Sequence, residues 1–128
     1  TQYGYSGTAQ APTSVTLPTA GRPAISIQRN AADLPTLITD PANVGGTPVQ
    51  VTYNAANLPV DVTDVKGRVT HTTYTAFNAV STVTTNYGTA TAATTSYFYN
   101  AAKLLDHVVD PLGHTVATYT YDSMGRPL

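Results

Sequence analysis

The three histidines, His71, His107 and His114, are the residues of this chain best suited to chemistry. Two of them lie near Asp106 and Asp110, and imidazole beside carboxylate can ligate metals or exchange protons. A metal site needs several ligands that converge on one ion, and nothing in this spacing requires convergence. Asp110 is better explained as the first residue of a turn. The sequence therefore predicts no catalytic residue, no metal ligand and no cofactor.

Other common functional signatures are missing as well. The sequence holds no nucleophile triad, no glycine-rich phosphate loop and no zinc-ligand spacing. Its 128 residues carry a net charge of −1 without a basic patch, which argues against a nucleic-acid partner. No apolar run approaches the roughly 18 residues of a membrane span. We therefore expect a chain that is not an enzyme and does not span a membrane.

Aromatic residues recur at one position of an internal repeat. They stand immediately before successive repeat starts, with Arg29 as the exception, and the column comprises Tyr5, Tyr53, Phe77, Tyr99 and Tyr121. Repeated positions of this kind stack on one face of a sheet. Packing within the sheet is the favoured interpretation. Because aromatic faces also stack on sugars, carbohydrate remains an alternative partner.

The repeat has a period of 22 to 24 residues. Similar residues begin successive units at intervals of 24 (30 to 54), 24 (54 to 78), 22 (78 to 100) and 22 (100 to 122); these starts are Asn30, Asn54, Asn78, Asn100 and Asp122, and Ser6 lies 24 residues before the first of them. The whole chain, 1–128, is thus predicted to be one array of about five to six repeats.

A second turn lies ten residues into most units. Each such turn begins with Asp and has Asn or Gly three residues later, as in Asp40 to Asn43, Asp64 to Gly67 and Asp110 to Gly113; Asp122 to Gly125 follows the same rule. Asp favours the first position of a type I turn, and the last residue takes a left-handed conformation. The runs between the turns are strand-like. This pattern predicts an all-β fold of tandem antiparallel β-hairpins in a long curved sheet.

Two motifs near the end of the sequence resemble a known family. The run 121–126 reads Tyr-Asp-Ser-Met-Gly-Arg and the run 110–113 reads Asp-Pro-Leu-Gly. With a period near 22, they resemble the YD-repeat, or Rhs-repeat, family, although the earlier units diverge and Asn replaces Asp. In that family the repeats form an antiparallel sheet that spirals into a hollow shell. Such shells occur in bacterial Rhs toxins and insecticidal toxin complexes, and related barrels occur in teneurin-type adhesion proteins.

The resemblance implies a secreted, extracellular structural protein: part of a toxin-type shell, or of a self-assembling fibre or filament. The expected partners are further repeats of the same chain or other copies of it, because open sheet edges pair with other strands. We expect either an interior piece of a longer array or a protomer that pairs with the next copy. The alternative function is a surface adhesion or carbohydrate-binding module. A hydrolase or self-processing protease, the third class, would need a cleft that unites Asp106, His107 and His114.

Overall fold

The computed structural model describes residues 1–7, 11–17, 21 and 23–128, and the described chain is all-β with no helix. This confirms the predicted fold class. Accordingly, the described residues hold no helix of the length and apolarity needed to cross a membrane. The chain divides into two compact units, 1–69 and 70–128. The strand segments are rich in Val, Ile, Thr and Tyr, which suit a pleated, half-buried surface.

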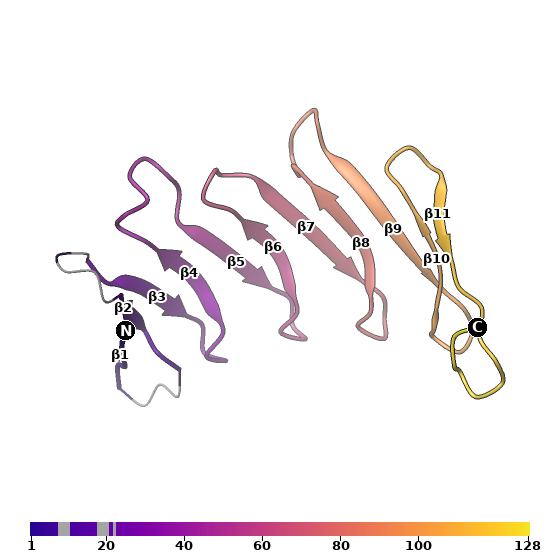
Figure 1. The fold of residues 1–128 in the computed structure, drawn as a ribbon, viewed down its shortest axis with the longest axis horizontal. Helices are drawn as coiled ribbons and strands as arrows, with labels where there is room; N and C mark the ends of the chain where they lie inside the picture. The colour runs from indigo at the N-terminus through magenta and orange to yellow at the C-terminus, as the bar shows by residue number, and fades with distance from the viewer. Residues whose placement is uncertain (8–10, 18–20, 22) are drawn as a thin grey trace. The chain divides into compact units, whose positions relative to one another are not determined.

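The described residues of the first unit form six strands (Figure 1). They are β1 (Gln2–Gly4), β2 (Ser14–Thr16), β3 (Ile25–Arg29), β4 (Pro35–Thr39), β5 (Val49–Tyr53) and β6 (Pro59–Thr63). Each strand pairs antiparallel with the next one in the sequence. Successive turns therefore lie at alternate ends of the strands.

The second unit repeats this arrangement with five strands. They are β7 (Val69–Tyr74), whose first residue lies at the unit boundary, β8 (Val80–Thr85), β9 (Ala93–Tyr99), β10 (Leu105–Val109) and β11 (Thr115–Thr118). Neighbours in sequence again pair antiparallel. The sequence therefore predicted correctly that consecutive hairpins would be the building blocks.

Strand register gives the sheet of the first unit two different faces. Ile27 pairs with Ile38, and Ile38 pairs with Val49. Val49 shares its face with Tyr53 because alternate residues point the same way, so we name this apolar side the tyrosine face. On the other side, which we name the amide face, Leu37 lies between two glutamines of the neighbouring strands.

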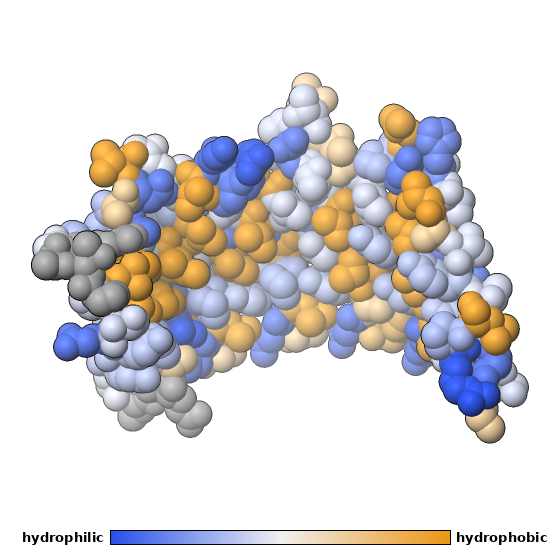
Figure 2. All heavy atoms as spheres, in the orientation of Figure 1, coloured by the Kyte–Doolittle hydropathy of each residue, from blue (hydrophilic) through white to orange (hydrophobic). Residues whose placement is uncertain are grey.

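Within each unit the sheet is a single layer. No hydrophobic side chain of the described residues is buried, and Thr84, at 9% exposure, is the one buried polar residue among them. Figure 2 shows apolar side chains open on the visible face of β3–β5. Antiparallel sheets usually bury such a face against a second layer. Each unit is therefore stabilised mainly by the strand pairing and the side-chain contacts within its own sheet.

Five hairpins of the described chain shift register near the turn; β5–β6 does so between Val51 and Tyr53, and in the other four the bulge has the same place. One extra residue stands six positions after the first residue of the turn: Thr36 after Asn30, Ser81 after Thr75, Asp106 after Asn100 and Val116 after Asp110. A bulge sets two residues of one strand against one residue of the other and increases the local twist. The repeat in the sequence is thus also a repeat in backbone geometry.

Candidate functional site

In the part of the chain that the structure describes, seven turns share one backbone hydrogen-bond pattern. The N–H of the first residue donates to the carbonyl of the fifth, and the N–H of the fourth donates back to the carbonyl of the first, over 2.8–3.1 Å. The first residues are Asn30, Asn54, Asp64, Thr75, Asn100, Asp110 and Asp122. These turns occur at both ends of the strands. The same turn structure therefore closes hairpins that differ widely in sequence.

The side chain of the first residue explains why Asn and Asp prevail there. Oδ1 of Asp64 accepts hydrogen bonds from the backbone N–H groups of Lys66 and Arg68, at 2.8 and 2.9 Å. Oδ1 of Asn54 accepts the equivalent pair from Ala56 and Leu58, at 2.9 and 3.0 Å. Asn and Asp side chains favour turns through such bonds to the backbone that follows.

In the Asp turns these bonds change the acidity of the carboxyl group. Hydrogen bonds from the Arg68 backbone and then from its guanidinium hold the pKa of Asp64 below its ordinary value of 3.8. The same two causes, supplied by Arg126, lower the pKa of Asp122. For Asp110 the backbone N–H of His114 is the main cause of a lowered pKa. Each folded turn therefore favours the ionised acid.

The fourth turn residue adopts the left-handed conformation in all seven turns. Its φ is 60° at Asp33 and at Asn57, 77° at Gly67, 64° at Asn78, 62° at Lys103, 85° at Gly113 and 77° at Gly125. Gly meets this requirement without steric cost, and Asn and Asp tolerate it. Lys103 has neither advantage, so its left-handed φ is strained.

Two sequence predictions need correction. Asn78 does not begin a unit: Thr75 does, because its hydroxyl accepts the Ala79 N–H at 3.1 Å, and Asn78 takes the left-handed fourth position. Phe77 consequently lies inside this turn, and Tyr74 ends β7. The Phe77 and Tyr99 rings pack in a T-shaped arrangement, with centroids 5.3 Å apart.

Asn43 is the other correction. Asp40 does begin a tight turn, with Asn43 N–H donating to its carbonyl at 3.0 Å. Asn43 lacks the predicted left-handed φ, however, and Gly45 has it instead, at 81°. The chain makes a second turn there, with Gly46 N–H donating to the Asn43 carbonyl at 3.1 Å. The two extra residues before this glycine lengthen the loop and relieve Asn43 of the left-handed conformation.

The tyrosine column joins neighbouring hairpins through hydrogen bonds. The hydroxyl of Tyr53 donates to the carbonyl of Pro35 at 2.8 Å, and those of Tyr99 and Tyr121 donate to Val80 at 2.7 Å and to Leu105 at 2.8 Å. Each acceptor lies five residues after a turn start, at 30, 75 and 100 respectively. These tyrosine hydroxyls thus bind the hairpin beside them, rather than standing free for a ligand.

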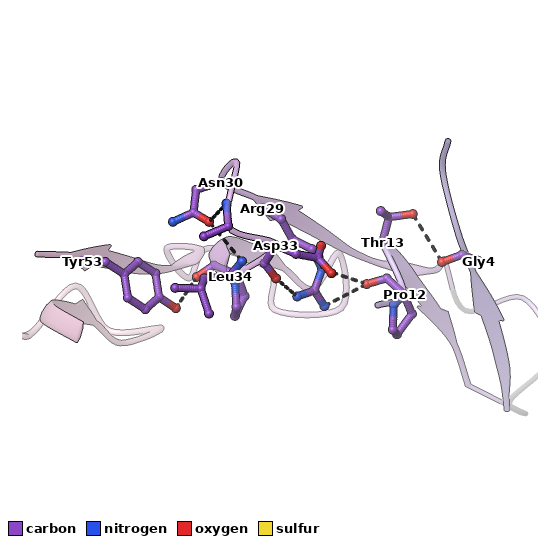
Figure 3. A network of polar contacts seen from close by, with 10 residues as sticks. Gly4, Pro12, Thr13, Arg29, Asn30, Asp33, Leu34 and Tyr53 are labelled. Carbon is purple, nitrogen blue, oxygen red and sulfur yellow. Dashed lines mark hydrogen bonds and ion pairs between the residues drawn. The ribbon is translucent and has the colours of Figure 1, made fainter. Parts of the chain in front are cut away.

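Arg29 stands immediately before the turn at Asn30, where other repeats have a tyrosine, and Figure 3 shows its contacts. Its Nη2 and Nε donate to the carbonyl of Pro12 at 3.0 and 3.4 Å, and its Nη1 donates to the carbonyl of Asp33 at 2.8 Å. Its side chain is only 16% exposed. Pro12 lies 17 residues before Arg29, close to the separation of the tyrosine bonds. The guanidinium therefore performs the same joining role, a solution that the sequence reasoning missed.

Asp106 and His107 form a contact that strand alternation argues against. His107 Nδ1 lies 2.7 Å from Asp106 Oδ2, although consecutive strand residues normally face opposite sides. The bulge at Asp106 accounts for this, because it disturbs the alternation. The His107 ring also stacks on Phe98, with centroids 4.4 Å apart.

The remaining histidines take part in separate contacts. His114 Nδ1 lies 3.3 Å from Asp110 Oδ2 within its own turn, and His71 stacks on Tyr87 at 4.3 Å between centroids. Across the described ranges, no group of three or more His or Asp side chains could hold a metal ion. Asp106 with His107 and Asp110 with His114 thus form two separate pairs, one at a bulge and one in a turn, and His71 lies in neither.

No protein-family model matches this chain, and no curated protein matches it either.

Proposed function

We propose that this chain is a structural segment of the YD/Rhs-repeat type, working outside the cytoplasm as part of a β-sheet shell or of a self-assembling fibre. The sheet itself performs the role, and the chain carries out no catalysis. Its partners are further repeats of the same kind, or further copies, that pair with its edge strands. The single observation behind this proposal is the repeated hydrogen bond from a strand-end tyrosine to the preceding hairpin.

This bond supports a structural role because the tyrosine hydroxyl is used to hold neighbouring hairpins together. A tyrosine hydroxyl offered to a ligand would remain accessible, whereas Tyr53, Tyr99 and Tyr121 donate theirs to backbone carbonyls. Arg29 preserves the bond where tyrosine is absent. Among the described residues no apolar side chain is buried, and a single-layer sheet of this kind gains stability from neighbouring repeats or copies.

The edge strands favour pairing with another chain or repeat. Among the described strands, β1 pairs only with β2, and β11 only with β10. An edge strand presents unpaired backbone groups that accept further strands, and charged residues on an edge prevent this. Tyr3 in β1 and Val116 in β11 are 59% and 60% exposed and uncharged.

The test is size-exclusion chromatography with light scattering, together with native imaging, at micromolar concentration. We expect assemblies larger than one chain. Tyr3→Lys should reduce assembly because it charges the edge strand, whereas Ser26→Lys, on internal strand β3, is the matched control and should not. A wild-type chain that stays monomeric while its edge strands remain ordered and exposed would contradict the proposal.

A further inference from the structure

The first unit contains a groove whose lining combines residues of the amide face with Val51 and Tyr53 of the tyrosine face. Its volume is about 440 Å³, and Leu37 and Thr36 of β4 lie between β3 and β5, whose side chains complete it. The other lining residues are Gln28, Asn30, Gln50, Val51, Thr52 and Tyr53. None of them is charged. The size lies within the range of small-molecule sites in proteins.

Strand register places two amides on either side of one apolar residue. Leu37 pairs with Gln28 of β3 and with Gln50 of β5, so all three point to the same face. The two glutamines are two strand spacings apart, which is about 10 Å. The bulge in β4 adds Thr36 beside Leu37. The result is an apolar floor between two groups that each donate and accept hydrogen bonds.

Equivalent positions elsewhere form contacts within the chain. Thr52 bonds to Asp61 at 3.2 Å, Thr73 bonds to Thr82 at 2.6 Å, and Phe98 stacks on His107. Each of these is a cross-strand pair at the corresponding point of a later hairpin. Among the described residues, Gln28 and Gln50 show no such hydrogen bond through their side chains. Their amides are therefore available to a ligand.

We propose that this groove binds a neutral oligosaccharide, a role beyond the structural one proposed above. A sugar ring lies with its C–H groups on Leu37, and the amides of Gln28 and Gln50 bond to hydroxyls on either side. The uncharged lining suits a neutral ligand, because each amide can serve a hydroxyl as donor or acceptor. The span between the glutamines accommodates a disaccharide. Tyr53 of the tyrosine column also lines the groove, but its hydroxyl already donates to the Pro35 carbonyl, so the two glutamines supply the polar contacts.

Binding is tested with cellotriose and maltotriose as probes. Saturation-transfer NMR observes the sugar and tolerates large assemblies, and calorimetry gives the affinity. We expect saturable binding of at least one probe. Gln28→Ala and Gln50→Ala should each weaken it about fivefold or more, the value of one neutral hydrogen bond. Ser26→Ala, exposed on the same strand as Gln28, is the matched control and should bind as the wild type does.

Several results would overturn the inference. It fails if neither probe binds saturably, or if the Gln28→Ala/Gln50→Ala double variant binds unchanged. It also fails if Phe98→Ala abolishes binding while the double variant retains it, because the sugar would then lie on the aromatic pair of the second unit. Circular dichroism verifies that each variant keeps the β-sheet signal of the wild type.

Discussion

The hydroxyl of Tyr99 donates a 2.7 Å hydrogen bond to the backbone carbonyl of Val80, nineteen residues earlier in the sequence. Tyr99 ends β9 and Val80 begins β8, so the bond fastens the ends of two adjacent strands beside their turns. Burial of Tyr99, and secondarily the charge of Tyr97, raises the pKa of its phenol above 10.0. The neutral hydroxyl that donates this bond is therefore the form present at physiological pH.

Removing this hydroxyl tests its contribution directly. Tyr99→Phe keeps the ring against Phe77 but leaves the Val80 carbonyl without its donor, and should lower the free energy of unfolding by about 1 kcal/mol. Chemical denaturation measures the change. Tyr97→Phe, on the same strand and face, removes a hydroxyl that makes no hydrogen bond within the described chain and should leave stability nearly unchanged. Equal losses in both variants would argue against a specific role for the bond.

Lys103 offers a stabilising substitution. Its φ of 62° is strained for a lysine, and Asn occupies the same turn position at Asn57 and Asn78. Lys103→Asn should raise the free energy of unfolding by roughly 0.5 kcal/mol, because relief of about 1 kcal/mol of strain exceeds the loss of an exposed cation–π contact with Phe77. Lys66→Asn, in a turn position without positive φ, is the control. A lower melting temperature for Lys103→Asn alone would contradict the strain argument.

Gly113 tests the turn geometry from the opposite direction. Its φ of 85° is accessible to glycine but not to a β-branched residue. Gly113→Val should therefore destabilise the hairpin of β10 and β11 by about 1 kcal/mol or more, whereas Gly113→Asn should be tolerated better. Thermal melts of the two variants provide the comparison, and an unchanged melting temperature for the valine variant would refute the assignment.

Acid should weaken the three Asp turns. The pKa values of Asp64, Asp110 and Asp122 are lowered in the folded chain, so their stabilising effect is fully present above the ordinary value of 3.8. It is lost as the pH falls through the lowered folded-state values. Denaturation curves across this acidic range measure the loss.

The control for the acid prediction replaces the three acids with amides. Asn keeps an oxygen that accepts the turn hydrogen bonds, as Asn54 does, but it does not titrate. The triple Asp→Asn variant should therefore lose less stability on acidification than the wild type. An identical acid response in both chains would place the pH dependence elsewhere.

The local rules were readable from the sequence because they depend on single residues. Asp64 with Gly67, or Asp110 with Gly113, determines a turn through its own hydrogen bonds and backbone freedom. The unit start was wrongly predicted at Asn78 instead of Thr75, because Asn suits the fourth position of this turn as well as the first. Sequence spacing alone does not distinguish these two roles. The threonine hydroxyl that accepts the Ala79 N–H resolves them.

The long-range contacts were less predictable, for a physical reason. The repeat spacing grouped Tyr53, Tyr99 and Tyr121, but the acceptors of their hydroxyls are backbone carbonyls, which every residue possesses. The role of Arg29 followed only from the position of Pro12. Likewise, Asp106 and His107 meet because a bulge disturbs the alternation on which the sequence reasoning relied. The amides of Gln28 and Gln50 could be placed on either side of Leu37 only from the strand register.

The long loops 40–48 and 86–92 give the two ends of the hairpins different tolerance to change. One added residue within a strand would turn every following side chain to the wrong face and break the tyrosine bonds. Added residues in these loops leave the register untouched, because loop closure costs little more as a loop lengthens. Variation in chain length among proteins built this way should therefore gather at the strand ends away from the tyrosines. That end is free to acquire new surface features, while the tyrosine end keeps the hairpins in register.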